Sequence, residues 1–127
     1  MQLKHLGLPV SDVARSRLFY ETYFAFDPAT AQVYPDGTVI IRNGDGFDLA
    51  LHRVDAVGDL PPFLHFGFGV ASPDRVRELH GRLLADNVDI IEYDDESFYV
   101  AFKAADPDGH RIEVYWETNP ETSTIIS

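Results

Sequence analysis

The chain has 127 residues, of which 45% are hydrophobic and 13% aromatic, so it is long enough for one compact core and too apolar for a disordered protein. It contains no cysteine, which excludes disulfides and thiolate metal sites. The formal net charge of −11, from 21 acidic and 10 basic residues, argues against nucleic acids and anionic membranes as partners and favours metal ions or cationic small molecules.

The sequence also predicts a location in the cell. No apolar run approaches the ~20 residues that a transmembrane helix needs, and the N-terminus does not resemble a signal peptide. Together with the absence of cysteine, these features predict a cytoplasmic protein. The acidity has a simpler alternative interpretation, in which it only keeps the protein in solution.

The first predicted element is a strand over residues 3–10, and the segment at 63–70 repeats its pattern. Each segment alternates bulky apolar residues on one face with a histidine and small residues on the other. The histidine is His5 in the first copy and His65 in the second. Because the apolar face must pack against the core, both histidines are expected on the face turned away from it.

A helix is predicted after each of these strands. Ser11 and Asp12 precede the first amphipathic stretch, which includes Phe19. Ser72 is placed to cap the second helix, and Pro73 suits its first turn. The order of strand and helix is therefore the same in both halves.

Three further strands are expected in each half. They cover residues 31–34, 38–42 and 47–52 in the first half, and 88–93, 98–105 and 111–116 in the second. The chain is therefore predicted to be an α+β protein made of two tandem βαβββ modules. The first module spans 1–53, a connector spans 54–62, the second module spans 63–117, and a polar tail spans 118–127.

Four side chains are candidate metal ligands because they recur on faces turned away from the two cores. They are His5, Asp48, His65 and Glu113. The histidines are 60 positions apart and the carboxylates 65, so Asp48 and Glu113 are interpreted as equivalent. If the modules pair by pseudo-two-fold symmetry, two imidazoles and one or two carboxylates converge on a divalent metal, with positions open for water or substrate.

The remaining histidines have other expected roles. A single histidine on a strand is more often structural than a ligand, but the recurrence of the pair in both halves favours the metal interpretation. His52 lies on the same predicted face as Asp48 and is a candidate catalytic base. His80 and His110 do not recur, so a surface or boundary position and a role in a turn are expected for them.

The segments HLGLPVSDVARSRLFYETYF and DPDGHRIEVYWE resemble the vicinal-oxygen-chelate superfamily, whose members include glyoxalases, fosfomycin resistance proteins, extradiol dioxygenases and metal-free bleomycin-binding proteins. The resemblance implies a glyoxalase-like fold, an open, cleft-bearing β-sheet barrel with flanking helices. It also implies a metal at His5, Asp48, His65 and Glu113, with Mn, Fe, Co, Ni or Zn as candidates. Aspartate at the fourth-strand position departs from the glutamate of glyoxalase I and is one methylene shorter.

Other departures from the resembled families narrow the expected activity. Short bacterial glyoxalases carry an arginine where this chain has Pro9, and glutathione-using fosfomycin resistance proteins carry a threonine where it has Gly7. Lys103 stands at the position of the catalytic tyrosine of extradiol dioxygenases. A lyase or isomerase is therefore expected in preference to an extradiol dioxygenase.

Two functions remain as hypotheses. In the first, a metal-dependent enzyme binds a small oxygen-chelating substrate, and Glu113, Asp48 or His52 moves a proton. In the second, the protein sequesters a cationic, aromatic antibiotic without a metal, as bleomycin-binding relatives do. The resemblance also implies a homodimer, in which the N-terminal module of one chain completes its site with the C-terminal module of another.

Overall fold

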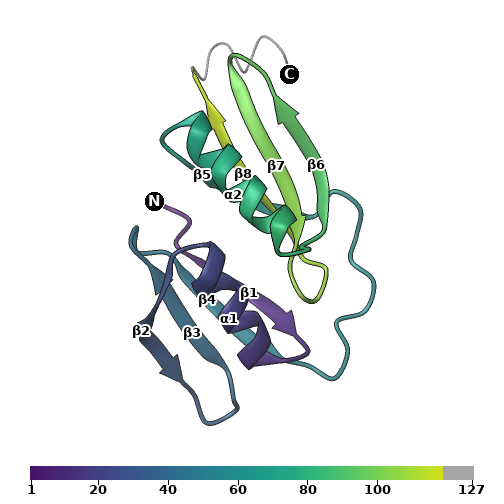
Figure 1. Ribbon diagram of the computed structural model, residues 1–127. Helices are drawn as coiled ribbons and strands as arrows, with labels where there is room; N and C mark the ends of the chain where they lie inside the picture. Colours follow the sequence, from purple (N-terminus) through teal and green to yellow (C-terminus); the bar gives the residue numbers. More distant parts are fainter. Residues whose placement is uncertain (119–127) are drawn as a thin grey trace. The chain divides into compact units, whose positions relative to one another are not determined.

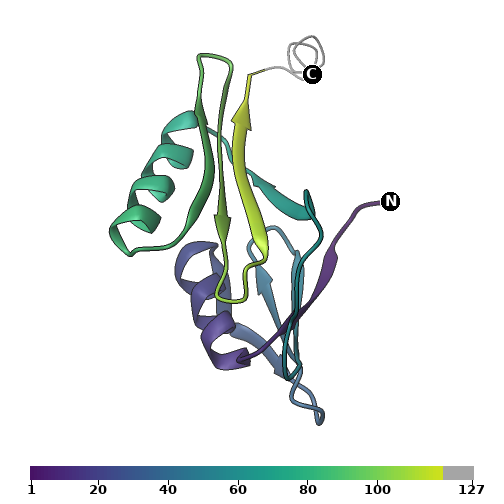
Figure 2. The ribbon, with the colours of Figure 1, turned by 90° about the vertical axis from the view of Figure 1, so that its right-hand side faces the viewer.

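The computed structural model describes residues 1–118 of the chain. The chain divides into two compact units, the first formed by residues 1–60 and the second starting at Pro61 (Figure 1). Each unit holds one helix and one open four-stranded sheet, and in each the helix lies on one side of its own sheet (Figure 2). No helix within residues 1–118 is both long enough and apolar enough to span a membrane.

The first unit has the order strand, helix, strand, strand, strand. Its elements are β1 (His5–Val10), α1 (Val13–Tyr23), β2 (Phe26–Val33), β3 (Val39–Asn43) and β4 (Asp48–Arg53). The strands are ordered β1-β4-β3-β2 in the sheet, with β1 parallel to β4 and the other neighbours antiparallel. The parallel pair brings the chain's beginning next to the last strand of the unit.

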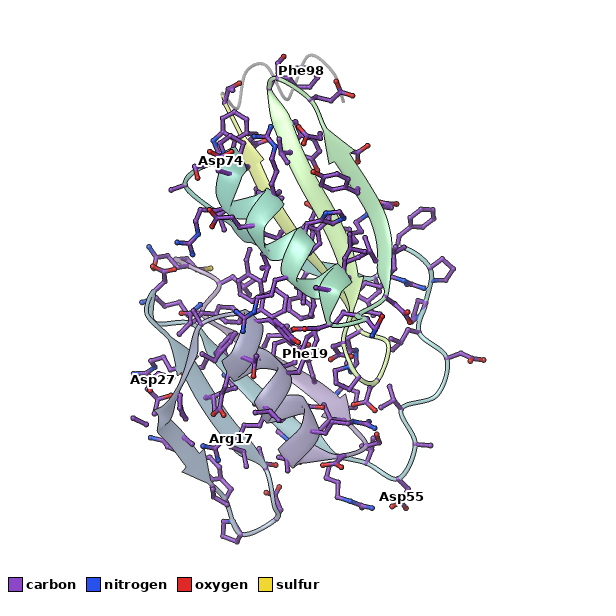
Figure 3. The ribbon with its side chains drawn as sticks, viewed as in Figure 1. Arg17, Phe19, Asp27, Asp55, Asp74 and Phe98 are labelled. Atoms are coloured by element: carbon purple, nitrogen blue, oxygen red, sulfur yellow. The ribbon has the colours of Figure 1, made fainter. Side chains whose placement is uncertain are left out.

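Helix α1 begins where the sequence predicts a cap. The side chain of Asp12 accepts a hydrogen bond of 3.0 Å from the backbone amide of Arg15, which satisfies one of the free donors of the first turn. Phe19, labelled in Figure 3, packs edge-to-face against Tyr20, and both rings are buried. These aromatic side chains fix the helix to the sheet through apolar burial.

The second unit repeats this order. Its elements are β5 (His65–Gly69), α2 (Pro73–Ala85), β6 (Ile90–Asp95), β7 (Tyr99–Ala105) and β8 (Arg111–Glu117), with sheet order β5-β8-β7-β6. Ser72 caps α2 by accepting from the amide of Arg75 at 3.3 Å, and Pro73 occupies the first turn. The core is formed by fully buried side chains of α2, β7 and β8: Val76, Leu83, Val100, Phe102, Ile112 and Val114.

The predicted α+β class and the two βαβββ repeats are confirmed. The largest difference lies in β2, which begins at Phe26 and not at residue 31, because the buried Phe26 ring ties the start of the strand to the core. The pairing of β2 with β3 shifts register between Asp27 and Gln32, which interrupts the alternation that sequence patterns detect. The predicted tail, apart from Thr118, lies outside the described residues.

Candidate functional site

His65 and Glu113 form the closest pair of candidate ligands in the second unit. Strands β5 and β8 run parallel, and Glu113 lies opposite Gly67, two residues after His65 on the same face. Nε2 of His65 is 4.0 Å from Oε2 of Glu113. That distance is too long for a hydrogen bond and somewhat longer than the roughly 3–3.6 Å between neighbouring donors of one metal with bonds of about 2.0–2.2 Å, so a small side-chain rotation would bring both atoms to a shared ion.

The other ring nitrogen of His65 determines which tautomer is present. Nδ1 lies 2.7 Å from the carbonyl oxygen of Phe63. A carbonyl oxygen only accepts hydrogen bonds, so Nδ1 carries the proton and the lone pair of the neutral ring sits on Nε2, toward Glu113. Metal-binding histidines are commonly held in this way, with the second ring nitrogen bonded to a backbone carbonyl. The donor set and its orientation therefore fit a divalent metal.

Side chains from the neighbouring strands surround Glu113. Lys103 lies opposite Glu113 in the pairing of β7 with β8, and its Nζ is 3.1 Å from Oε2 of Glu92. Burial, reinforced by the negative charge of Glu113, raises the pKa of Tyr99 to about 12. The phenol of Tyr99 is therefore protonated at neutral pH, as in an ordinary tyrosine, and stays so to higher pH.

The candidate ligands of the first unit are His5 and Asp48. They lie directly opposite each other where β1 pairs with β4. The carboxylate of Asp48 is engaged by Arg42, whose Nε donates to Oδ1 at 2.7 Å and whose Nη2 donates to Oδ2 at 3.3 Å. These hydrogen bonds from Arg42 lower the pKa of Asp48. The carboxylate is thus ionised, but both of its oxygens already have a cationic partner.

The strand register corrects the equivalence expected between Asp48 and Glu113. In the second unit, Glu113 lies opposite Gly67. Gly7 is the equivalent glycine of the first unit, and the residue opposite it is Ala50. Asp48 lies opposite His5 instead. The structural counterpart of Glu113 is therefore Ala50. The expectation was wrong because it matched two carboxylates across connections of unequal length: Gly7 and Ala50 are 43 positions apart, but Gly67 and Glu113 are 46.

His52 lies on the same face of the first unit. Its Nδ1 is 3.0 Å from the hydroxyl of Thr38, and a Cβ added to Gly7 would lie 3.3 Å from its Nε2. The ring therefore covers Gly7, where any side chain would press against it. An open hollow of about 520 Å³ adjoins this ring, and its walls include His5, Asp36, Thr38, Ile40, Ala50 and His52.

Thr38 and Asp36 were missed by sequence reasoning. The register that places Val39 opposite Leu51 puts Thr38 opposite His52, so the contact becomes evident only once the strand pairing is known. No periodic signal marks Asp36, which precedes β3 in the connecting turn.

Two of the three histidines outside the proposed ligand set, His80 and His110, are held by contacts away from the candidate ligands. His80 of α2 stacks on Tyr93 of β6, with ring centroids 3.8 Å apart and planes at 7°. His110 is buried, and its amide donates to Oδ1 of Asp106 at 2.9 Å, which closes the turn before β8. Across residues 1–118, three or more His, Asp or Glu side chains are nowhere grouped tightly enough to hold a metal. The candidate ligands occur as one pair in each unit.

Comparison with known proteins identifies the family. The Glyoxalase/Bleomycin resistance protein/Dioxygenase superfamily profile matches residues 2–114. The trivalent organoarsenical cleaving enzyme of Bacillus sp. (strain MD1) is 30% identical over 132 residues, which cover 98% of this chain and 80% of that protein. Both matches extend over nearly the whole chain.

Solved structures agree with this match. A possible glyoxalase from Bacillus cereus has a TM-score of 0.75 and 30% identity, covering 90% of this chain and 97% of its own. The fosfomycin resistance protein FosX from Listeria monocytogenes shares the fold, with a TM-score of 0.80, 19% identity and coverage of 95% and 97%. FosX has also been solved in complex with Mn(II) and sulfate. The chain belongs to the Glyoxalase/Bleomycin resistance protein/Dioxygenase superfamily.

Proposed function

We propose that this protein is a metal-dependent enzyme in which His65 and Glu113 of the second unit bind a divalent metal, with His5 and Asp48 as the further members of the ligand set. The observation that carries the proposal is the orientation of His65. Its Nδ1–H is held by the carbonyl of Phe63, and its Nε2 lone pair lies 4.0 Å from the carboxylate of Glu113. Metal-binding histidines are commonly oriented in this way, with the second ring nitrogen bonded to a backbone carbonyl.

The donor atoms define the class of metal. Two imidazoles and a carboxylate, with no cysteine in the chain, suit borderline first-row ions, and we propose Mn, Fe, Co, Ni or Zn. The Mn(II) found in FosX falls within this group.

We propose that Asp48 interacts with the metal through a water molecule and does not bind it directly. Its carboxylate would have to leave Arg42 before it could bind an ion directly. A water molecule between Asp48 and the metal avoids that loss, and the short aspartate side chain favours the same arrangement. Asp48 is therefore the weakest member of the proposed ligand set.

The proposed reaction is a lyase or isomerase reaction on a small, oxygen-chelating substrate. A divalent metal bound at this site would act as a Lewis acid toward substrate oxygens. Glu113 and His52 are the groups proposed to move a proton. Lys103, paired with Glu92, occupies the place of the extradiol tyrosine, so dioxygenase chemistry of that type is disfavoured.

The Bacillus relative is named as an enzyme that cleaves trivalent organoarsenicals. The composition of this chain argues against the same activity. Trivalent arsenic is a soft, thiol-seeking centre, and this chain has no cysteine to capture it. We therefore place the substrate among oxygen-bearing molecules.

The alternative function is sequestration of a cationic, aromatic antibiotic without a metal. The net charge of −11 and the hollow lined by Tyr34 and Asp36 favour it. Elemental analysis of protein purified without an affinity tag or chelator separates the two functions. The enzyme proposal expects a near-stoichiometric divalent first-row metal. Metal-free protein that also ignores added Mn(II), Fe(II), Co(II), Ni(II) and Zn(II) would reject it and support antibiotic binding.

A further inference from the structure

A tight turn leads into strand β5. The backbone amide of Leu64 donates to the carbonyl oxygen of Pro61 at 3.4 Å, so residues 61–64 form a β-turn with Pro62 and Phe63 as its central residues. Phe63 has a φ of 68°, in the left-handed region. Proline followed by a left-handed residue is the pattern of a type II turn, in which the left-handed position is usually taken by glycine. Phenylalanine is therefore held there in an unfavourable backbone conformation.

The side chain of Phe63 does not account for this conformation. It is 89% exposed, so its ring gains little apolar burial that could offset the backbone strain. The first unit has the same order of elements but no such turn, since residues 1–4 before His5 are irregular. The turn is therefore a feature of the second unit and not a requirement of the repeat.

Two hydrogen bonds tie the turn to the sheet of the second unit. Nη1 of Arg111 on β8 donates to the carbonyl oxygen of Pro61 at 3.0 Å, between residues 50 positions apart. The carbonyl oxygen of Phe63 accepts from Nδ1–H of His65 at 2.7 Å. Arg111 lies opposite His65 where β5 pairs with β8, so its side chain reaches the turn from the neighbouring strand. The turn is thus held at its first residue by Arg111 and holds His65 through its third.

We infer that Arg111 is a positioning residue for His65: it clamps the turn, and the clamped turn presents a carbonyl oxygen to Nδ1. Rotation about the N–Cα bond of Phe63 sets the direction of that carbonyl group, so opening of the turn moves the acceptor away from the ring. The proton is then no longer held on Nδ1, and the lone pair is no longer kept on Nε2, toward Glu113. The inference rests on the proposed function for the use of Nε2 as a metal ligand but not for the positioning itself.

Nitrogen-15 NMR of the histidine side chains tests this positioning in the full chain, treated with chelator so that metal binding does not enter. At about pH 8, above the ordinary pKa of histidine, the rings are neutral and the two nitrogens report the tautomer. His65→Gln identifies the signals of His65. The wild type should show His65 protonated at Nδ1, opposite to the preference of a free imidazole side chain.

Arg111→Met keeps an unbranched side chain and removes the donor. The ratio of the Nδ1–H to the Nε2–H form of His65 should therefore fall by about two- to tenfold, the range that one hydrogen bond contributes. Arg53→Met is the matched control, because Arg53 ends β4 of the first unit and pairs there with Asp55, and it should leave the ratio unchanged. An Arg111→Met ratio equal to wild type would overturn the inference, as would wild-type His65 protonated at Nε2.

Phe63 offers a second pair of variants, which keeps the test decisive if Arg111→Met does not fold. Proline fixes φ at about −65°, so Phe63→Pro abolishes the turn and should lower the ratio by at least about twofold. Glycine adopts a φ of 68° without strain, so Phe63→Gly should keep the wild-type ratio. Equal ratios in these two variants would overturn the inference. Lack of Mn(II) binding by the wild type would instead reject the proposed function and leave these spectra unaffected.

Discussion

Nε2 of His65 and Oε2 of Glu113 lie 4.0 Å apart, too far to form a hydrogen bond with each other and within a small side-chain rotation of sharing a metal ion. The side chains remain 35% and 21% exposed, so neither is locked in the apolar core. Phe63, whose carbonyl fixes the tautomer of His65, has a φ of 68°, an unfavourable conformation for a residue with a side chain. Strain of this kind persists only where the surrounding structure imposes it.

Gly67→Ala should disturb this pair. A Cβ at Gly67 would lie 3.3 Å from Cε1 of Tyr115, so this ring must give by a few tenths of an ångström, and 3.4 Å from Cβ of Glu113, at the limit of ordinary contact, which leaves the Glu113 side chain less room to adjust to a metal. We expect metal affinity, measured by calorimetric titration with Mn(II), to fall by roughly tenfold, as it does when a group that orients a ligand is lost. Unchanged affinity would show that Glu113 need not keep its position.

Gly81→Ala is the matched control for this substitution. Gly81 lies on α2 with nothing within 4 Å of an added Cβ. Because alanine is favoured over glycine inside a helix, the variant should be more stable than the wild type by about 0.5–1 kcal/mol, with unchanged Mn(II) affinity. Chemical denaturation measures the stability.

Arg42 should control whether Asp48 can reach the metal. In the wild type, Asp48→Ala is expected to weaken metal binding only slightly, because Arg42 already holds both carboxylate oxygens. Arg42→Gln removes that partner, so the same Asp48→Ala change should cost more affinity in the Arg42→Gln background. A double-mutant cycle by calorimetry measures the difference. Equal losses in both backgrounds would show that Arg42 does not compete with the metal.

Asp95 should give the second unit a pH-dependent stability. Hydrogen bonds from Arg77 and then Tyr93 lower the pKa of Asp95 to about 2. When the pKa of a carboxyl group is lower in the folded state than in the unfolded state, the group stabilises the fold fully at pH values above its unfolded-state pKa of about 3.9. That contribution is lost as the pH falls through the folded-state pKa. Asp95→Asn should therefore have a lower Tm than the wild type at pH 6, and the difference should disappear between about pH 4 and 2. A Tm difference that persists at pH 2 would contradict this assignment.

We expect the protein to form a homodimer. Each sheet ends in unpaired edge strands, β1 and β2 in the first unit and β5 and β6 in the second, and such edges are usually covered by another surface. Light scattering at micromolar concentration should give twice the mass of 14.3 kDa. A monomer that still binds metal would place all ligands in one chain.

The repeat could be predicted because apolar residues alternate with polar or small residues in the first strand of each half, and this pattern is visible in the sequence. His5 and His65 were found as strand residues opposite the apolar faces of β1 and β5, where the structure places them. The counterpart of Glu113 was not found, since Ala50 carries no chemical signal and the register depends on connection length. The contacts of Asp48 with Arg42 and of His52 with Thr38 were also missed. They depend on rotamers and on the pairing of neighbouring strands, which residue patterns do not determine.

The central claim is that His65 is a metal ligand, and titration of Mn(II) into chelator-treated protein tests it most directly. Wild type should bind one ion per chain, and the Mn(II) affinity of His65→Ala should be lower by at least about 100-fold. Loss of a residue that only orients a metal ligand already lowers the affinity by up to about 100-fold, and loss of the ligand itself should cost more. His80→Ala removes a histidine that stacks on Tyr93 and should bind Mn(II) like wild type. The metal-free His65→Ala variant should also keep its fold, because this side chain is partly exposed and lies on the face away from the core. A His65→Ala variant that binds Mn(II) like wild type, or that unfolds without metal, would make His65 a structural residue and contradict the account.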